Sequence, residues 1–216
     1  MSPDLRAELL AVARRLNASG INQGTSGNLS LRTPGGFLIT PSALPYELMG
    51  PDDLVALDLH GRPSVDSPVA RHRPSSEWRL HADVLRNRPE VNAVVHCHSI
   101  RATALACHSR GIPSFHYMVA VAGGEDIRCT PYALFGTAEL SRLTLTALEG
   151  RMASLLGHHG QVTLGRSLDE ALRLAIEVET LAAMYLEASR LGEPPLLGPA
   201  EMARVLNQMR ALNYGH

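Results

Sequence analysis

Residues 93–98 read Ala-Val-Val-His-Cys-His, an apolar run that ends in two histidines. The run predicts a buried strand, because it is short, rich in valine and preceded by the helix breaker Pro89. Side chains two positions apart on a strand share one face and lie roughly 7 Å apart, so His96 and His98 can bind one metal ion. Cys97 then faces the opposite way, and we expect it in the core rather than among the metal ligands.

Predicted strands and helices alternate outward from this run in both directions. We expect strands at residues 28–32, 37–40, 55–59, 117–121, 153–158 and 161–164, and helices at residues 3–19, 75–87, 101–107, 137–149, 167–191 and from 199 toward 214. Ser2, Thr137 and Ser167 are the expected N-caps of three of these helices. Several strands are close enough in sequence to form hairpins. This pattern predicts an α/β sandwich with a mostly antiparallel or mixed sheet.

The chain has 216 residues, of which 45% are hydrophobic, and its formal net charge is −1. We expect residues 1–216 to form a single domain, since no linker divides a chain of this length. The charge argues against nucleic acid and against an anionic membrane surface as partners. The N-terminus lacks the order of a signal peptide, no apolar run is long enough to span a bilayer, and the three cysteines form no CxxC pair. These features predict a soluble, cytoplasmic protein.

All 20 basic residues are arginine. Without an ε-amine the protein can form no Schiff base with a carbonyl substrate or with pyridoxal phosphate, and it has neither a P-loop lysine nor a protein-kinase lysine. A carbonyl group would therefore have to be activated by a metal ion or by hydrogen bonds. The 10 histidines make a metal site the first candidate.

A third nitrogen ligand for the two strand histidines could come from His158 or His159, in the turn formed by residues 157–160. Three protein ligands and one open position are typical of catalytic zinc, whereas a structural zinc normally has four protein ligands. Glu77 lies at the start of a predicted helix, where a solvated carboxylate that stabilises the helix is the default interpretation. His81 shares its helix face four residues later, and we interpret it as structural.

Three short segments have the composition of an anion-binding site. The loop 24–28 contains small residues and short hydroxyls, residues 40–43 add hydroxyls at a strand end, and the serines at 75 and 76 lie at a helix N-terminus, where phosphate binds readily. Each segment alone is a weak signal, because such residues also form ordinary turns and caps.

The chain resembles the class II aldolase and adducin family over nearly its whole length, from about residue 6 to residue 214, and a set of motifs carries the resemblance. Those motifs are residues 23–32 (QGTSGNLSLR), 38–47 (LITPSALPYE), 74–81 (PSSEWRLH), 93–99 (AVVHCHS), 115–124 (FHYMVAVAGG), 132–140 (YALFGTAEL) and 157–160 (GHHG). Within the family they are most similar to the motifs of the enzymes that cleave L-fuculose 1-phosphate. The resemblance implies a central, mainly antiparallel sheet flanked by helices. It also implies a homotetramer with its active sites between subunits.

Carried over position by position, the resemblance implies a role for each matching residue. The metal ligands would be His96, His98 and His159, holding Zn²⁺, with Co²⁺ or Mn²⁺ as alternatives. The contacts to the substrate phosphate would be Gly27, Asn28, Ser42, Ala43, Ser75 and Ser76. Glu77 would be the acid/base group, and Tyr117 would exchange a proton with the oxygen of the aldehyde part. Tyr214, in a C-terminal tail at residues 207–216 near the site, would shield it or assist proton transfer, and both tyrosines would reach it from a neighbouring subunit.

The implied reaction is the reversible cleavage of a small phosphorylated sugar, a ketose 1-phosphate. Its products would be dihydroxyacetone phosphate and a short aldehyde such as L-lactaldehyde, formed through a metal-stabilised enediolate. Four positions depart from the motifs of the fuculose enzymes. Ser42-Ala43 stands for Thr-Gly, Cys97 stands for asparagine, and Gln161 stands where an apolar residue is common. These departures leave the implied metal ligands and acid/base group intact and bear on the choice of substrate.

Other reactions of the family keep the same metal and glutamate. An aldolase for 5-deoxyribulose 1-phosphate or methylthioribulose 1-phosphate would differ only in its aldehyde pocket. A methylthioribulose-1-phosphate dehydratase would eliminate water, and a 3-oxo-tetronate-4-phosphate decarboxylase would release CO₂. A ribulose-phosphate 4-epimerase fits the flanking motifs less well. A non-catalytic, adducin-like assembly module is disfavoured, because such modules lose the metal ligands that this sequence keeps.

Overall fold

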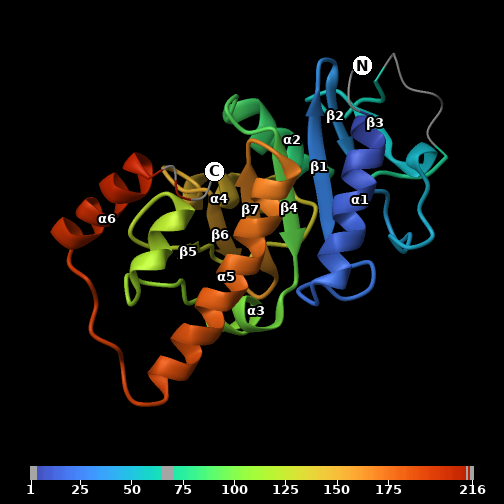
Figure 1. Cartoon of the computed structure of the whole chain (residues 1–216). Coiled ribbons are helices and arrows are strands. Elements are labelled where there is room, and N and C mark those ends of the chain that lie inside the picture. The colour runs from blue at the N-terminus through green and yellow to red at the C-terminus, as the bar shows by residue number, and fades with distance from the viewer. Residues whose placement is uncertain (1–3, 65–70, 213, 215–216) are drawn as a thin grey trace.

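The structure is a computed structural model, and it describes residues 4–64, 71–212 and 214. The strands span Asn28–Thr33 (β1), Gly36–Ile39 (β2), Val55–Leu57 (β3), Ala93–Cys97 (β4), Arg128–Cys129 (β5), Ala153–Leu156 (β6) and Gly160–Gly165 (β7). They form one sheet in the order β3-β2-β1-β4-β7-β6-β5 (Figure 1). Neighbouring strands are antiparallel, except that β5 runs parallel to β6. The expected α/β sandwich with a central, mainly antiparallel sheet is therefore confirmed.

Helices cover both faces of this sheet (Figure 1). The α-helices span Leu5–Ala18 (α1), Trp78–Asn87 (α2), Ile100–Cys107 (α3), Ala138–Ala147 (α4), Leu168–Ser189 (α5) and Pro199–Ala211 (α6). Two 3₁₀ helices span Pro51–Asp53 (η1) and Tyr117–Ala122 (η2). No helix within the described ranges combines the length and the apolar character needed to cross a lipid bilayer.

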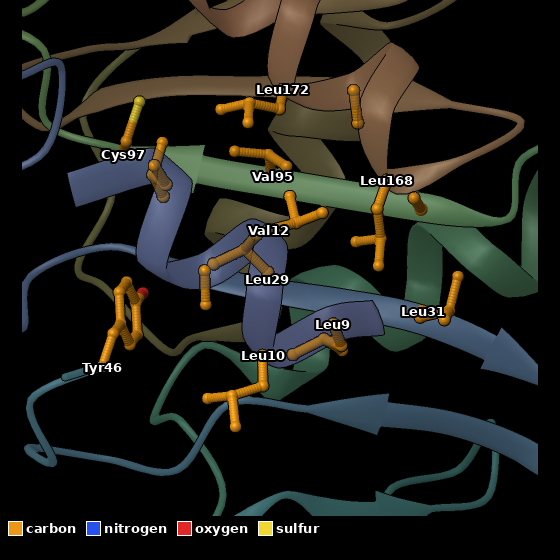
Figure 2. Packing of buried hydrophobic residues seen from close by; sticks show 14 of the residues in the cluster. Leu9, Leu10, Val12, Leu29, Leu31, Tyr46, Val95, Cys97, Leu168 and Leu172 are labelled. Atoms are coloured by element: carbon orange, nitrogen blue, oxygen red, sulfur yellow. The ribbon is translucent and has the colours of Figure 1, made fainter. Parts of the chain in front are cut away.

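One face of the sheet packs against α1 and α5. Alternate residues of β4, Val95 and Cys97, join Leu29 of β1 in a fully buried cluster with Leu9 of α1 and Leu172 of α5 (Figure 2). Burying a leucine-sized side chain contributes about 1.5–3 kcal/mol, so this cluster fixes the register of both central strands. Cys97 lies in this core, as the period of two along the strand predicts.

The opposite face packs against α2 and α4. Val94 of β4 joins Leu80 and Val84 of α2 and Leu140 of α4 in a second buried cluster. The alternation that places Cys97 in the first cluster turns His96 toward this side, where α2 begins. The core packing on the two faces therefore determines which side of β4 carries the site.

A third cluster joins α3, the C-terminal half of α5, α6 and η2. The expectation of a strand at residues 117–121 is wrong, because this segment forms the 3₁₀ helix η2. His116 caps its start by accepting a hydrogen bond from the Met118 N–H, and Gly123 ends it with a φ of 91°. This continuously apolar segment buries Val119 and Ala120 against helices instead of pairing with a sheet edge.

Helix starts depend on local capping groups. Thr137 and Ser167 cap α4 and α5 as expected, each accepting a hydrogen bond from a backbone N–H of the first turn. Asp4 caps α1, while Ser2, the expected cap, lies outside the described residues. Helix α2 begins at Trp78 rather than Ser75, and Glu77, at its N-cap position, makes no side-chain capping hydrogen bond.

Candidate active site

Three histidines converge where β4 ends. His96 belongs to β4, His98 follows the strand directly, and His159 lies in the turn between β6 and β7. Pairing of β7 with β4 brings that turn beside the strand end. The three ring centroids are 4.8–4.9 Å apart, and one nitrogen of each ring lies within 4.8 Å of the others. His158 is exposed, packs edge-on against Tyr132 and is not part of this cluster.

Two glycines allow the chain to approach β4 at this point. A Cβ on Gly160 would lie 2.5 Å from the Cys97 carbonyl oxygen and 2.9 Å from the His98 ring. A Cβ on Gly27 would lie 2.8 Å from the His96 carbonyl oxygen. Any larger residue would push the histidine turn or the loop before β1 away from the strand. Both glycines thus have a packing reason for their positions.

The ring nitrogens of the cluster face one another. The Nδ1–H of His96 donates to the Gln161 carbonyl oxygen at 2.8 Å, which leaves Nε2 facing the Nε2 of His98 at 3.1 Å. Burial and the charge of His96 lower the pKa of His98 and of His159 to about 4. Both rings are therefore neutral at pH 7, the form in which imidazole binds metal.

Glu77 lies against this cluster and is only 5% exposed. Its Oε2 is 3.1 Å from the His96 Nε2, and its Oε1 is 3.4 Å from the His159 Nε2. Burial raises the pKa of Glu77, but the charge of His96 and hydrogen bonds from His96 and Asn28 outweigh burial and lower it below the ordinary value. The carboxylate is thus ionised at neutral pH. Burial lowers the pKa of His96, but the charge of Glu77 and its hydrogen bond outweigh burial, so the pKa of His96 is raised. The site therefore favours positive charge beside the carboxylate.

Three buried side chains, those of Asn28, His81 and Ser30, form a row of hydrogen-bond contacts that starts at Glu77. The Asn28 Nδ2 donates to the Glu77 Oε2 at 3.0 Å, and the Asn28 Oδ1 lies 2.5 Å from the His81 Nε2. The His81 Nδ1 lies 2.7 Å from the Ser30 Oγ. Burial, followed by the charge of His96, lowers the pKa of His81 to about 3, so this ring is neutral. The contacts of both ring nitrogens agree with the structural role expected of His81.

The segments expected to bind phosphate meet at the same end of the sheet. Pro41 and Pro74 form an isolated antiparallel bridge, flanked by hydrogen bonds from the Ser42 N–H to Arg73 and from the Ser75 N–H to Thr40. Thr40 in turn exchanges hydrogen bonds with Leu29, next to the loop that ends at Asn28. These contacts place Ser42 and Ser75 close to the start of β1, where Asn28 contacts Glu77 at the start of α2. Gly27, Ala43 and Ser76 are their neighbours in sequence.

Tyr117 and Tyr214 lie apart from the histidine cluster within one chain. Both line a groove of about 450 Å³ beside α6, and they are 49% and 51% exposed. The expected tail at 207–216 is helical as far as Ala211 at the end of α6, and residues 213, 215 and 216 of that tail lie outside the described residues. That Tyr117 and Tyr214 reach the site of a neighbouring subunit stays a prediction.

A family model described as the class II aldolase and adducin N-terminal domain matches residues 7–186 of the chain. Over 206 residues the chain is 50% identical to the 5-methylthioribulose-1-phosphate/5-deoxyribulose-1-phosphate aldolase of Rhodospirillum rubrum, covering 95% of this chain and 91% of that protein. Over 207 residues it is 42% identical to the L-fuculose phosphate aldolase of Escherichia coli K12, covering 95% and 94%. A solved L-fuculose 1-phosphate aldolase matches with a TM-score of 0.91 at 34% identity, covering 97% of this chain and 98% of that chain.

Proposed function

Because the chain belongs to the class II aldolase and adducin family, we propose that it cleaves 5-methylthioribulose 1-phosphate or 5-deoxyribulose 1-phosphate with the help of a zinc ion. Class II aldolases are metal-dependent carbon–carbon lyases, and this chain is one of them. The observation that carries the proposal is the convergence of three histidines and a buried glutamate at the end of β4. The products would be dihydroxyacetone phosphate and a short aldehyde.

His96, His98 and His159 would hold the metal. Nitrogens bound to tetrahedral zinc at about 2.05 Å lie about 3.3 Å apart, and the two Nε2 atoms of His96 and His98 are 3.1 Å apart. The Glu77 Oε1 is buried and has no hydrogen-bond partner among the residues that the structure describes, which also fits a cation nearby. When bound, the metal supplies the positive charge that stabilises the enediolate left by carbon–carbon cleavage. Zinc suits three neutral imidazoles, with Co²⁺ and Mn²⁺ as alternatives.

Glu77 would move the proton at the donor carbon. During cleavage it returns a proton to the enediolate carbon, and in the condensing direction its carboxylate removes that proton. Its lowered pKa keeps it in the basic form at neutral pH. Tyr117 would exchange a proton with the oxygen of the departing aldehyde, and Tyr214 would shield the site. Since these two tyrosines lie apart from the histidines of their own chain, we propose that they act on a neighbouring subunit of a homotetramer.

The comparisons favour the deoxyribulose-type substrates over L-fuculose 1-phosphate. Identity to the Rhodospirillum rubrum enzyme is 50%, against 42% to the Escherichia coli K12 fuculose enzyme. The substrates differ in the aldehyde that leaves. Acetaldehyde and methylthioacetaldehyde lack the hydroxyl that L-lactaldehyde carries next to its carbonyl group. The initial expectation of L-fuculose 1-phosphate therefore gives way to the alternative weighed beside it.

A cleavage assay on the three ketose 1-phosphates tests this choice. We expect kcat/KM for the two ribulose derivatives to exceed that for L-fuculose 1-phosphate by about 10- to 100-fold, the range over which a pocket discriminates small side groups. Release of dihydroxyacetone phosphate is followed by a coupled reductase, with and without a chelator. A reversed order of rates would restore L-fuculose 1-phosphate as the substrate. No release from any substrate, with metal bound, would contradict the aldolase proposal in favour of the dehydratase or decarboxylase.

Ala43 offers a test of the proposed phosphate site. Its φ of 59° is left-handed, which costs a residue with a Cβ about 1–2 kcal/mol. Glycine removes this strain, but it also raises the conformational entropy of the unfolded chain, which lowers stability by about 0.4–1 kcal/mol. We therefore expect Ala43→Gly to raise the free energy of unfolding by up to about 1 kcal/mol in urea titrations. We also expect a severalfold lower KM, because a Cβ leaves the position where the backbone would meet phosphate.

Ser109→Gly is the matched control for this substitution. Ser109 is an exposed residue after α3 with a φ of 52°, so glycine should relieve a similar strain there. It lies outside the three phosphate segments, and we expect its KM to stay at the wild-type value. An equal fall of KM in both variants would contradict a phosphate contact at Ala43.

A further inference from the structure

A continuous row of four buried polar side chains ends at the acid/base group. Ser30 and His81 are 0% exposed, Asn28 is 4% exposed and Glu77 is 5% exposed. Polar groups are costly to bury unless each finds a partner, and buried polar networks specify one geometry when every link is satisfied. Ser30 and Asn28 lie two apart on β1 and face the start of α2, which carries both Glu77 and His81.

The hydrogen bonds in this row have only one consistent direction. The Asn28 Nδ2 donates to the Glu77 Oε2, so the Asn28 Oδ1 is the atom that faces the His81 Nε2. That oxygen can only accept, and the neutral ring therefore carries its proton on Nε2. The His81 Nδ1 then accepts from the Ser30 hydroxyl. Each link pairs one donor with one acceptor.

We propose that His81 is a positioning residue that fixes Glu77 through the Asn28 amide, an inference that rests on the proposed function. An asparagine amide rotated by 180° has nearly the same shape but would turn its oxygen toward the Glu77 carboxylate. Two neighbours oppose this rotation: the amide oxygen would face the Glu77 carboxylate, and the His81 Nε2–H would face the amide NH₂ group. The Glu77 Oε2 is thereby held by Asn28, while Oε1 has no hydrogen-bond partner within the described part of the chain. The row thus selects Oε1 as the oxygen that receives the transferred proton.

Two substitutions at His81 separate positioning from simple space filling. Leucine fills the space but donates no hydrogen bond, whereas the amide of glutamine can donate to the Asn28 Oδ1. We expect His81→Leu to lower proton exchange at saturating dihydroxyacetone phosphate by about 10- to 100-fold, the range typical of losing an outer-shell partner. Its metal content should stay at the wild-type level. We expect His81→Gln to recover about tenfold of that loss.

Thr144→Val is the matched control for these variants. Thr144 is fully buried in α4 and donates to the Leu140 carbonyl oxygen, so valine removes a buried hydrogen bond outside the row. We expect it to lower the free energy of unfolding without changing the exchange rate. Equal losses of exchange in His81→Leu and His81→Gln, or unchanged exchange in His81→Leu, would overturn the positioning role.

Nitrogen NMR of histidine-labelled, metal-free protein tests the same inference without any substrate. We expect His81 to show a protonated Nε2 and an unprotonated Nδ1 at pH 7. A proton on Nδ1 would reverse the direction of the row and overturn the inference. If the wild-type protein cleaves none of the three ketose 1-phosphates but shows the expected His81 tautomer, the proposed function fails while the fixed row of hydrogen bonds stands.

Discussion

Replacing Glu77 with glutamine is expected to lower exchange of the donor proton by about 10²- to 10⁴-fold, the usual contribution of a general acid/base group, while the metal stays bound. Glutamine keeps the volume of the side chain and can accept the hydrogen bond from Asn28. Its amide cannot take up a proton at neutral pH, whereas the buried Glu77 carboxylate is ionised there. The loss should therefore be chemical and should leave the packing around α2 unchanged.

Proton NMR measures this exchange as the loss of one hydroxymethyl signal of dihydroxyacetone phosphate in D₂O, and elemental analysis measures the metal. Glu179→Gln is the matched control. Glu179 is also a mostly buried carboxylate, with its side chain 13% exposed, but it accepts hydrogen bonds from the Arg101 and Ala102 N–H groups at the start of α3. Wild-type exchange in Glu77→Gln would rule out the acid/base role. Loss of metal in that variant would instead show that the carboxylate is needed to hold the ion.

Most strands of the sheet could be predicted from apolar segments and from the alternation of side chains along a strand. The run at 93–98 predicted a buried strand with His96 and Cys97 on opposite faces, and both faces are where that alternation places them. A strand was also expected at residues 117–121, a continuous apolar run, and there the expectation failed. There the Tyr117–Ala122 segment packs between helices, and a histidine cap and Gly123 close it as a 3₁₀ helix. Short apolar segments are ambiguous, because they can be buried either as a strand in a sheet or as a helical turn packed between helices.

The candidate site was predictable only in part from local spacing. Spacing alone left His158 and His159 open, because the left-handed φ of 56° at His158, which sets the two rings apart, depends on the turn. The resemblance to the family pointed to His159. The row from Ser30 to Glu77 was not predicted, although two signals were present. Asn28 and Ser30 share a strand face, and Glu77 and His81 are four apart, but only the packing of β1 against α2 joins the two pairs.

Replacing His159 with alanine is expected to lower metal affinity by more than about 100-fold and to abolish cleavage. Losing an outer-shell partner of a metal ligand typically costs 10- to 100-fold, and loss of one of three direct ligands should cost more. The remaining pair, His96 and His98, would present only two nitrogens to the ion. Added Zn²⁺, Co²⁺ or Mn²⁺ should restore cleavage by wild-type protein whose metal a chelator has removed. The ion that restores the most activity identifies the preferred metal.

His158→Ala is the matched control, because it removes the neighbouring imidazole from the same turn. His158 is exposed and packs against Tyr132, outside the three-histidine cluster. We expect this variant to bind metal and cleave substrate as the wild-type protein does, which calorimetry and the coupled assay measure. If His158→Ala lost the metal and His159→Ala kept it, the ligand assignment would be reversed. If both kept it, the metal would have to lie elsewhere, and the convergence of rings at the end of β4 would need another explanation.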